Sequence, residues 1–184
     1  MFVDRQTFDK VKQGSDIPSS PYAEYIQQVD SFQTEEVRTC TAGFVKNSKT
    51  NQIAAFHIYP NFDNYVNIRG IIERILELAD NPDEGILIGS KDCGTSPYSR
   101  DMFGMAKRIL SKKVKGLTVF EEHKDPASET NMSYSANNDT LYIQAKYRDK
   151  QTGQFKDVST EKELQNFYKK IKVAPNDVVI FPKT

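Results

Sequence analysis

The chain has 184 residues, of which 38% are hydrophobic, so it can bury the core of one ordinary domain. Lys plus Arg and Asp plus Glu number 25 each, so no net charge would draw the protein to nucleic acid or to an anionic membrane, and we predict neither partner. The amino terminus has no basic flank followed by an apolar run, and the apolar stretches are too short to cross a bilayer. We therefore expect neither a signal peptide nor a transmembrane segment.

The chain has two cysteines, Cys40 and Cys93, and two histidines, His57 and His123. Two cysteines are too few for a disulfide framework, and the four residues lack paired metal-ligand spacing. We expect reduced thiols, no metal and no organic cofactor. The protein would then act in the cytoplasm, or in a host cytoplasm after delivery as an effector.

The sequence predicts an irregular lead-in over residues 1–30, with at most one short helix, followed by a single catalytic domain over residues 31–184. Residues 38–45 and 52–59 are rich in β-branched and apolar side chains, and a polar loop separates them. This pattern indicates a β-hairpin.

The hairpin also predicts a register. A loop centred between Ser48 and Lys49 pairs residues whose numbers sum to 97, and Cys40 with His57 is such a pair. Directly opposed residues of an antiparallel pair lie on one face, with Cα atoms about 4.5–5.5 Å apart. The thiol would then lie within reach of the imidazole.

Four further elements follow in chain order. Residues 65–80 carry an apolar stripe at helical spacing and predict an amphipathic helix. Residues 85–89 form a short apolar run bounded by glycines, which favours a buried strand. A second helix is predicted over residues 99–113, and another strand over residues 117–122.

After a polar stretch over residues 125–138, residues 139–147 alternate as in a strand with one face in water. Thr160 and Glu163 form a capping box that predicts a helix reaching Ile171, and residues 178–181 favour a closing strand. The mixture predicts an α+β fold of mixed or antiparallel β-sheets packed with two to three amphipathic helices. The oligomeric state stays open.

The chemistry centres on Thr34, Cys40 and His57. Cys40 follows Thr34 by six positions, and His57 follows Cys40 by seventeen. A thiol attacks as its thiolate, and a neighbouring imidazole can take the thiol proton and pass it to a leaving group. A hydroxyl that orients the imidazole would complete a triad.

This spacing resembles that of the chemotaxis deamidase family CheD. The order of elements after His57 is also similar, since an apolar residue, Pro60 and a helix are followed by a short strand ending in Gly89, a second helix and further strands. The resemblance covers residues 34–148 in layout. Thr39 and Thr41 flank the cysteine, where CheD usually has Gly-Ser before it and Val after it.

The spacing is also similar to that of eukaryotic amino-terminal asparagine amidohydrolases, which have an acidic pair and a threonine before the cysteine, as Glu35, Glu36 and Thr39 do here. Deamidases of the cytotoxic necrotizing factor type use a related fold. The resemblance implies that the chain deamidates Gln or Asn of a protein target. It also implies that Cys40 is the nucleophile, His57 the general base and acid, and Thr34 the residue that orients His57.

Other interpretations remain open. Cys40 is also typical of a small buried side chain in a strand. His57 is also typical of a core histidine that donates to a backbone carbonyl. Cys93 with His123 and Asp125 is a rival catalytic set on loops after strands. The chain would alternatively be an amino-terminal Asn or Gln amidohydrolase, an inactive protein-binding module on the same fold, or a thiol peptidase or acyltransferase.

Overall fold

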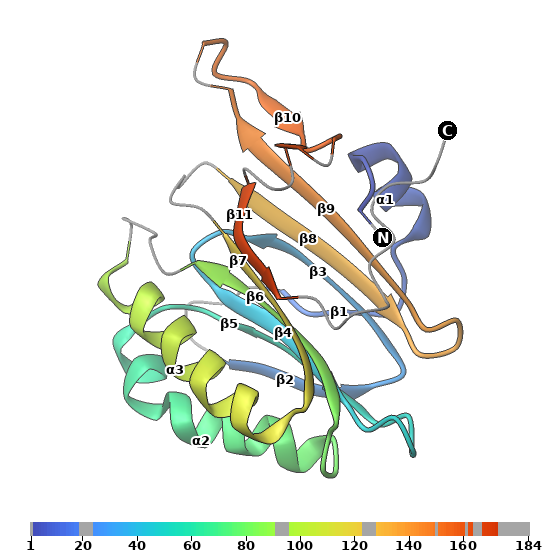
Figure 1. The fold of residues 1–184 in the computed structure, drawn as a ribbon, viewed down its shortest axis with the longest axis vertical. Coiled ribbons are helices and arrows are strands. Elements are labelled where there is room, and N and C mark those ends of the chain that lie inside the picture. The colour runs from blue at the N-terminus through green and yellow to red at the C-terminus, as the bar shows by residue number, and fades with distance from the viewer. Residues whose placement is uncertain are drawn as a thin grey trace.

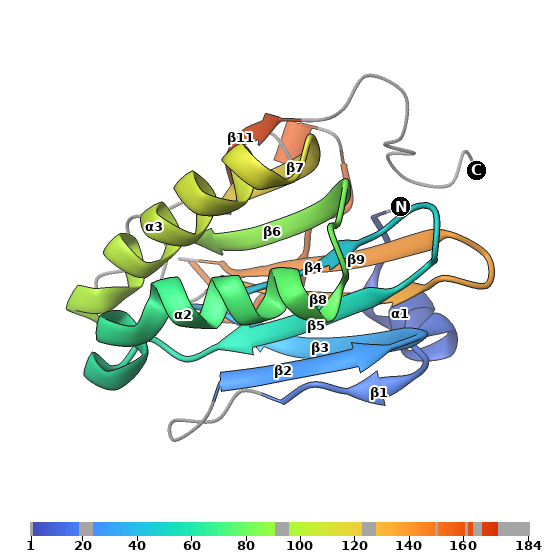
Figure 2. The ribbon, with the colours of Figure 1, turned by 90° about the horizontal axis from the view of Figure 1, so that it is seen from below.

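The computed structural model describes residues 2–18, 24–90, 96–122, 128–149, 151–160, 162–163 and 167–172. Within these residues the protein is an α+β fold with two mixed sheets and three helices, as predicted. The two sheets face each other, α2 and α3 cover the outer face of one, and α1 lies beside the other (Figures 1 and 2). None of the described helices has both the length and the apolar character needed to cross a bilayer.

The six-stranded sheet has the order β11-β7-β6-β4-β5-β2. Its strands are β2 (Glu24–Val29), β4 (Thr41–Lys46), β5 (Ile53–Ile58), β6 (Glu84–Ser90), β7 (Gly116–Glu122) and β11 (Tyr168–Lys172). All neighbours pair antiparallel except β6 and β7, which are parallel. The predicted hairpin is therefore confirmed as β4 and β5, and the predicted strands over residues 85–89 and 117–122 are confirmed as β6 and β7.

The five-stranded sheet has the order β1-β3-β8-β9-β10. Its strands are β1 (Ser15–Asp16), β3 (Ser31–Val37), β8 (Glu129–Ser135), β9 (Thr140–Arg148) and β10 (Phe155–Asp157). β1 pairs parallel with β3, and the other neighbours pair antiparallel. The predicted strand over residues 139–147 is confirmed as β9.

The helices are α1 (Arg5–Val11), α2 (Phe62–Leu78) and α3 (Pro97–Lys113). α2 begins after Asn61, whose side chain accepts from the Asn64 amide, and α3 begins after the corresponding cap Ser96. The apolar stripes of both helices are buried, which confirms the two predicted amphipathic helices.

Two apolar cores result from this layering. One fills the space between the sheets and includes Phe32, Cys40, Ala42 and Ile88. The other lies between the six-stranded sheet and the helices α2 and α3. Side chains of β5 alternate between the two cores, and every residue of this strand is buried. Position 57 therefore faces the space between the sheets.

The prediction of an irregular lead-in is wrong for residues 24–29. They form β2, which pairs with β5 along its whole length. The short helix allowed there is confirmed as α1, and Phe2, Phe8 and Ile17 are almost completely buried. Tertiary packing thus incorporates a polar segment that local sequence alone does not mark as structured.

Two later predictions are also corrected. The polar stretch over residues 125–138 contains β8, all of whose residues are buried. The capping box of Thr160 and Glu163 forms, with two reciprocal hydrogen bonds of 3.1 and 3.2 Å, but residues 168–172 form β11 against β7 instead of a helix. The predicted strand over residues 178–181 lies outside the described residues.

Candidate active site

Thr34 lies in β3, on the face that looks toward the six-stranded sheet. The pairing of β3 with β8 shifts between Thr34 and Val37, and Glu36 has a φ of 59° within this interval. The irregularity is a β-bulge, which inserts an extra residue and reverses the alternation of side chains. Phe32, Thr34 and Val37 are therefore all fully buried.

His57 lies in β5 and contacts Thr34 across the two sheets. The Oγ1 of Thr34 is 2.7 Å from Nδ1 of His57, and both side chains are fully buried. The predicted orienting residue and the predicted base, which are 23 positions apart in the chain, are thus brought into hydrogen-bond contact.

A second hydrogen bond of Thr34 fixes where the imidazole carries its proton. Thr34 Oγ1 lies 2.6 Å from the carbonyl oxygen of Ile17. A carbonyl can only accept, so the single hydroxyl hydrogen of Thr34 goes to Ile17, and His57 Nδ1–H donates to Thr34. Nε2 of His57 is then the unprotonated nitrogen, which can accept a proton.

Burial keeps this imidazole neutral. Desolvation lowers the pKa of His57 to about 4, against the smaller, opposing effect of the nearby Ile17 carbonyl. His57 Nε2 is buried without a hydrogen-bond partner among the described residues. A buried acceptor of this kind is unusual in a folded core. The site therefore holds a neutral imidazole whose Nε2 has no hydrogen-bond donor among the described residues.

Cys40 lies on the same face as His57 but not directly opposite, so the predicted register is wrong by two residues. Ala42 is the residue that pairs with His57. Cys40 precedes Ala42 by two positions and belongs to the same core between the sheets. Cys40 lies one residue before Thr41, the first residue of β4, so it is outside the ladder that pairs β4 with β5. The Cys40 thiol is not the hydrogen-bond partner of His57 Nε2.

The loop between β4 and β5 explains the two-residue difference. Asn47 opens the loop, and its side-chain oxygen accepts from the amides of Lys49 and Thr50 at 3.0 and 3.3 Å. Asn51 closes it with a φ of 58°, a left-handed conformation that asparagine tolerates. The loop is therefore centred between Lys49 and Thr50. A shift of two residues keeps every side chain on its predicted face.

The segment around Cys40 is held by the amino-terminal part of α3. Ser99 donates to the carbonyl oxygen of Thr39, and Ser96 donates to that of Pro60 at 2.9 Å. Cys40 is a thiol with 4% of its surface exposed. A Cβ added at Gly89 would clash with the ring of Phe103 and lie 3.3 Å from the Cys40 carbonyl oxygen, so this position favours a residue without a side chain.

Sequence reasoning missed Ile17, Ser96 and Ser99. Ile17 acts through its backbone carbonyl, for which a sequence has no signal. Ser96 followed by Pro97 is an ordinary helix start, so this motif could have predicted where α3 begins. The rival set of Cys93, His123 and Asp125 lies outside the described residues.

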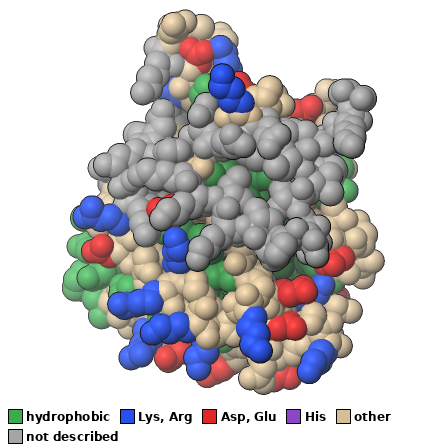
Figure 3. Space-filling model, in the orientation of Figure 1, with side chains coloured by type: hydrophobic (Ala, Val, Ile, Leu, Met, Phe, Trp, Pro, Cys, Tyr) green, Lys and Arg blue, Asp and Glu red, His purple; other side chains and the backbone are tan. Residues whose placement is uncertain are grey.

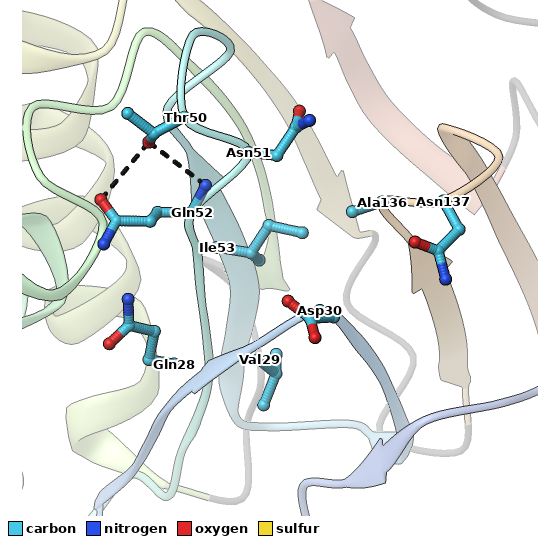
Figure 4. A pocket seen from close by; sticks show the side chains of 9 residues that line it. All are labelled: Gln28, Val29, Asp30, Thr50, Asn51, Gln52, Ile53, Ala136 and Asn137. Carbon is cyan, nitrogen blue, oxygen red and sulfur yellow. Dashed lines mark hydrogen bonds between the residues drawn. The ribbon is translucent and has the colours of Figure 1, made fainter.

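A hollow of about 330 Å³ lies at the opposite end of β5 from His57. The residues that line it are Gln28, Val29, Asp30, Thr50, Asn51, Gln52, Ile53, Ala136 and Asn137 (Figure 4). They come from the end of β2, from the start of β5, from the loop between β4 and β5, and from the turns after β2 and β8. This hollow is separate from Thr34, Cys40 and His57.

Charged side chains on the surface are mixed in sign. Basic and acidic groups are interspersed on the lower part of the face that Figure 3 shows. Lys107, from the basic side of α3, pairs with Glu121 at 2.9 Å. Among the described residues, no group of three or more His, Cys, Asp and Glu side chains could hold a metal ion.

No protein-family model and no curated protein matches this sequence.

Proposed function

We propose that the protein is a cysteine-dependent protein deamidase, which converts a side-chain carboxamide of Gln or Asn in a protein target to the acid. Cys40 is the nucleophile, His57 the general base and acid, and Thr34 the residue that orients His57. The observation that carries the proposal is the hydrogen-bonded sequence from the Ile17 carbonyl through Thr34 to His57 Nδ1, which leaves Nε2 as the acceptor.

In the first half of the reaction, His57 Nε2 takes the proton of the Cys40 thiol while sulfur attacks the carboxamide carbon. The resulting oxyanion requires hydrogen-bond donors, which we assign to backbone amides near Cys40. The imidazolium then donates its proton to the amide nitrogen, and the C–N bond breaks. Ammonia leaves, and the substrate acyl group remains on sulfur as a thioester.

In the second half, His57 Nε2 takes a proton from water, and the hydroxide attacks the thioester carbon. The C–S bond breaks, and the proton returns to sulfur. The products are Glu or Asp on the target and a regenerated thiol. No metal or organic cofactor takes part in this sequence.

The lowered pKa of His57 defines its resting state. An imidazole with a pKa of about 4 is neutral at neutral pH, so Nε2 carries no proton at the start of the reaction. The target is a protein that meets the enzyme in the cytoplasm, or in a host cytoplasm after delivery.

The proposal is tested by mass spectrometry of host and self proteomes incubated with the wild type, Cys40→Ala and Cys93→Ala. Cys93→Ala is the matched control, because it removes the other thiol of the chain. We expect a shift of about 1 Da per modified site with the wild type and Cys93→Ala but not with Cys40→Ala. Identical spectra for all three would contradict deamidation, and peptide-bond cleavage would favour the peptidase.

A further inference from the structure

A row of buried polar side chains crosses the outer face of the five-stranded sheet, away from Cys40. Asn131 in β8 and Gln144 in β9 are both fully buried, although the alternation of residues 139–147 predicts one face in water. Buried amides cost free energy unless each donor and acceptor has a partner. The hydrogen-bond partners of these amides therefore indicate which part of the fold they stabilise.

The row begins at the β-bulge that carries Thr34. Asn131 Oδ1 accepts from the backbone amide of Glu36 at 2.7 Å, and Asn131 Nδ2 donates to Gln144 Oε1 at 2.6 Å. Gln144 Nε2 donates to Asp157, whose other oxygen accepts from the Arg5 amide at 3.1 Å. Each amide is thus oriented by its next neighbour.

The Glu36 amide needs this acceptor because the bulge removes it from regular pairing. The pairing of β3 with β8 resumes only at Val37 and Thr130, so Asn131 lies beside the interrupted interval. The hydrogen bond from Glu36 to Asn131 is partly buried, and a partly buried N–H that loses its acceptor would destabilise the bulge. If β3 became regular, Thr34 and Val37 would have to point to opposite faces. Both face the core only while the bulge persists.

We propose that Asn131 is a positioning residue for the Thr34–His57 pair, which it controls by holding the β-bulge at Glu36. This inference rests on the proposed function for its effect on catalysis. Its structural part does not depend on catalysis: Asn131 keeps Thr34 in the position in which Thr34 holds the proton of His57 on Nδ1. The side chain of Asn131 lies on the opposite face of the sheet from Thr34 and touches no reacting atom.

The test compares Asn131→Leu, Asn131→Asp and Ser133→Ala. Leucine removes the acceptor for the Glu36 amide, whereas aspartate retains an oxygen there. Ser133 is the matched control, because it is buried on the same strand, two residues away, and its hydroxyl accepts from the Gln13 amide at 3.1 Å. The first readout is ¹⁵N NMR of the His57 ring nitrogens, which distinguishes the two neutral tautomers without any substrate.

We expect Asn131→Leu to mix the His57 tautomers and to lower kcat about tenfold, with a smaller change in KM. Asn131→Asp and Ser133→Ala should both retain the Nδ1–H tautomer. An unchanged tautomer in Asn131→Leu would overturn the proposal, as would an equal change in Ser133→Ala.

If Asn131→Leu does not fold, Gln144→Leu provides the same comparison, because it removes the group that orients the Asn131 amide. The two claims fail separately. A wild type that shows the Nδ1–H tautomer but deamidates nothing would contradict the proposed function, and the tautomer measurements would still decide the role of Asn131.

Discussion

The low pKa of His57 predicts how the stability of the protein depends on pH. In the unfolded chain a histidine takes up a proton below about pH 6.5, whereas burial lowers the pKa of His57 in the folded protein to about 4. Between these values the unfolded chain binds more protons, so the free energy of unfolding falls as the pH falls. Between pH 7 and about pH 4.5, the titration of His57 alone should lower the free energy of unfolding by about 2–3 kcal/mol.

The assay is urea unfolding at both pH values for the wild type and His57→Gln. Glutamine is neutral at both pH values and can still donate to Thr34. The difference between the two proteins in how much unfolding free energy they lose therefore excludes the contribution of the other titrating groups. On going from pH 7 to pH 4.5, the free energy of unfolding should fall by about 2–3 kcal/mol more in the wild type than in His57→Gln. Equal losses would refute a buried, neutral His57, and a smaller loss in the wild type would indicate a raised pKa.

Three further variants test other parts of the account. Thr34→Val leaves the Ile17 carbonyl and His57 Nδ1 without their shared partner, so it should lower kcat about a hundredfold, and wild-type turnover would refute the orienting role of Thr34. Phe8→Ala removes a fully buried ring near the amino terminus and should cost about 3–5 kcal/mol in urea unfolding, whereas an independent lead-in would lose almost nothing. Lys46→Met removes the cation that donates to Tyr134 and Asp139 at the far end of β4, so it should cost about 1–3 kcal/mol and leave kcat unchanged, and a large fall in kcat would contradict the location of the site.

The layout of the site was predictable where it depends on local periodicity. Alternation along residues 38–45 and β5 predicts that Cys40 and His57 share a face. Cys40 lies just before β4 but belongs to the core between the sheets, which position 57 also faces, because the error in register is an even number of residues. The exact partner of His57 was not predictable. It depends on the asparagines that open and close the loop, Asn47 and Asn51, and on hydrogen bonds within the loop.

The position of Thr34 could not be derived from spacing. A bulge at Glu36 and the turn after Val37 return the chain so that Thr34 and β4, which begins directly after Cys40, lie on facing sheets. The acceptor that holds the bulge, Asn131, comes 95 positions later in a strand whose polar composition resembles a loop. A local sequence pattern does not reveal which distant residue forms a hydrogen bond with a buried polar group.

The same limit applies to the end of the described chain. The capping box at Thr160 is a correct local signal, but it does not decide the structure of residues 168–172. Pairing with β7 and the hydrogen bond between Tyr168 and Thr130, at 3.0 Å, favour a strand there. Tertiary contacts override helix propensity in this segment.

The central claim is that Cys40 hydrolyses a carboxamide through a thioester, and solvent labelling tests it most directly. Target fractions are incubated with the wild type in H₂¹⁸O and in ordinary water. We predict a shift of about 3 Da in labelled water and about 1 Da in ordinary water, because solvent oxygen enters the acid when the thioester is hydrolysed. Cys40→Ala should abolish both shifts, and Cys93→Ala should retain them. Labelled product that persists in Cys40→Ala, or its absence with the wild type, would contradict the account.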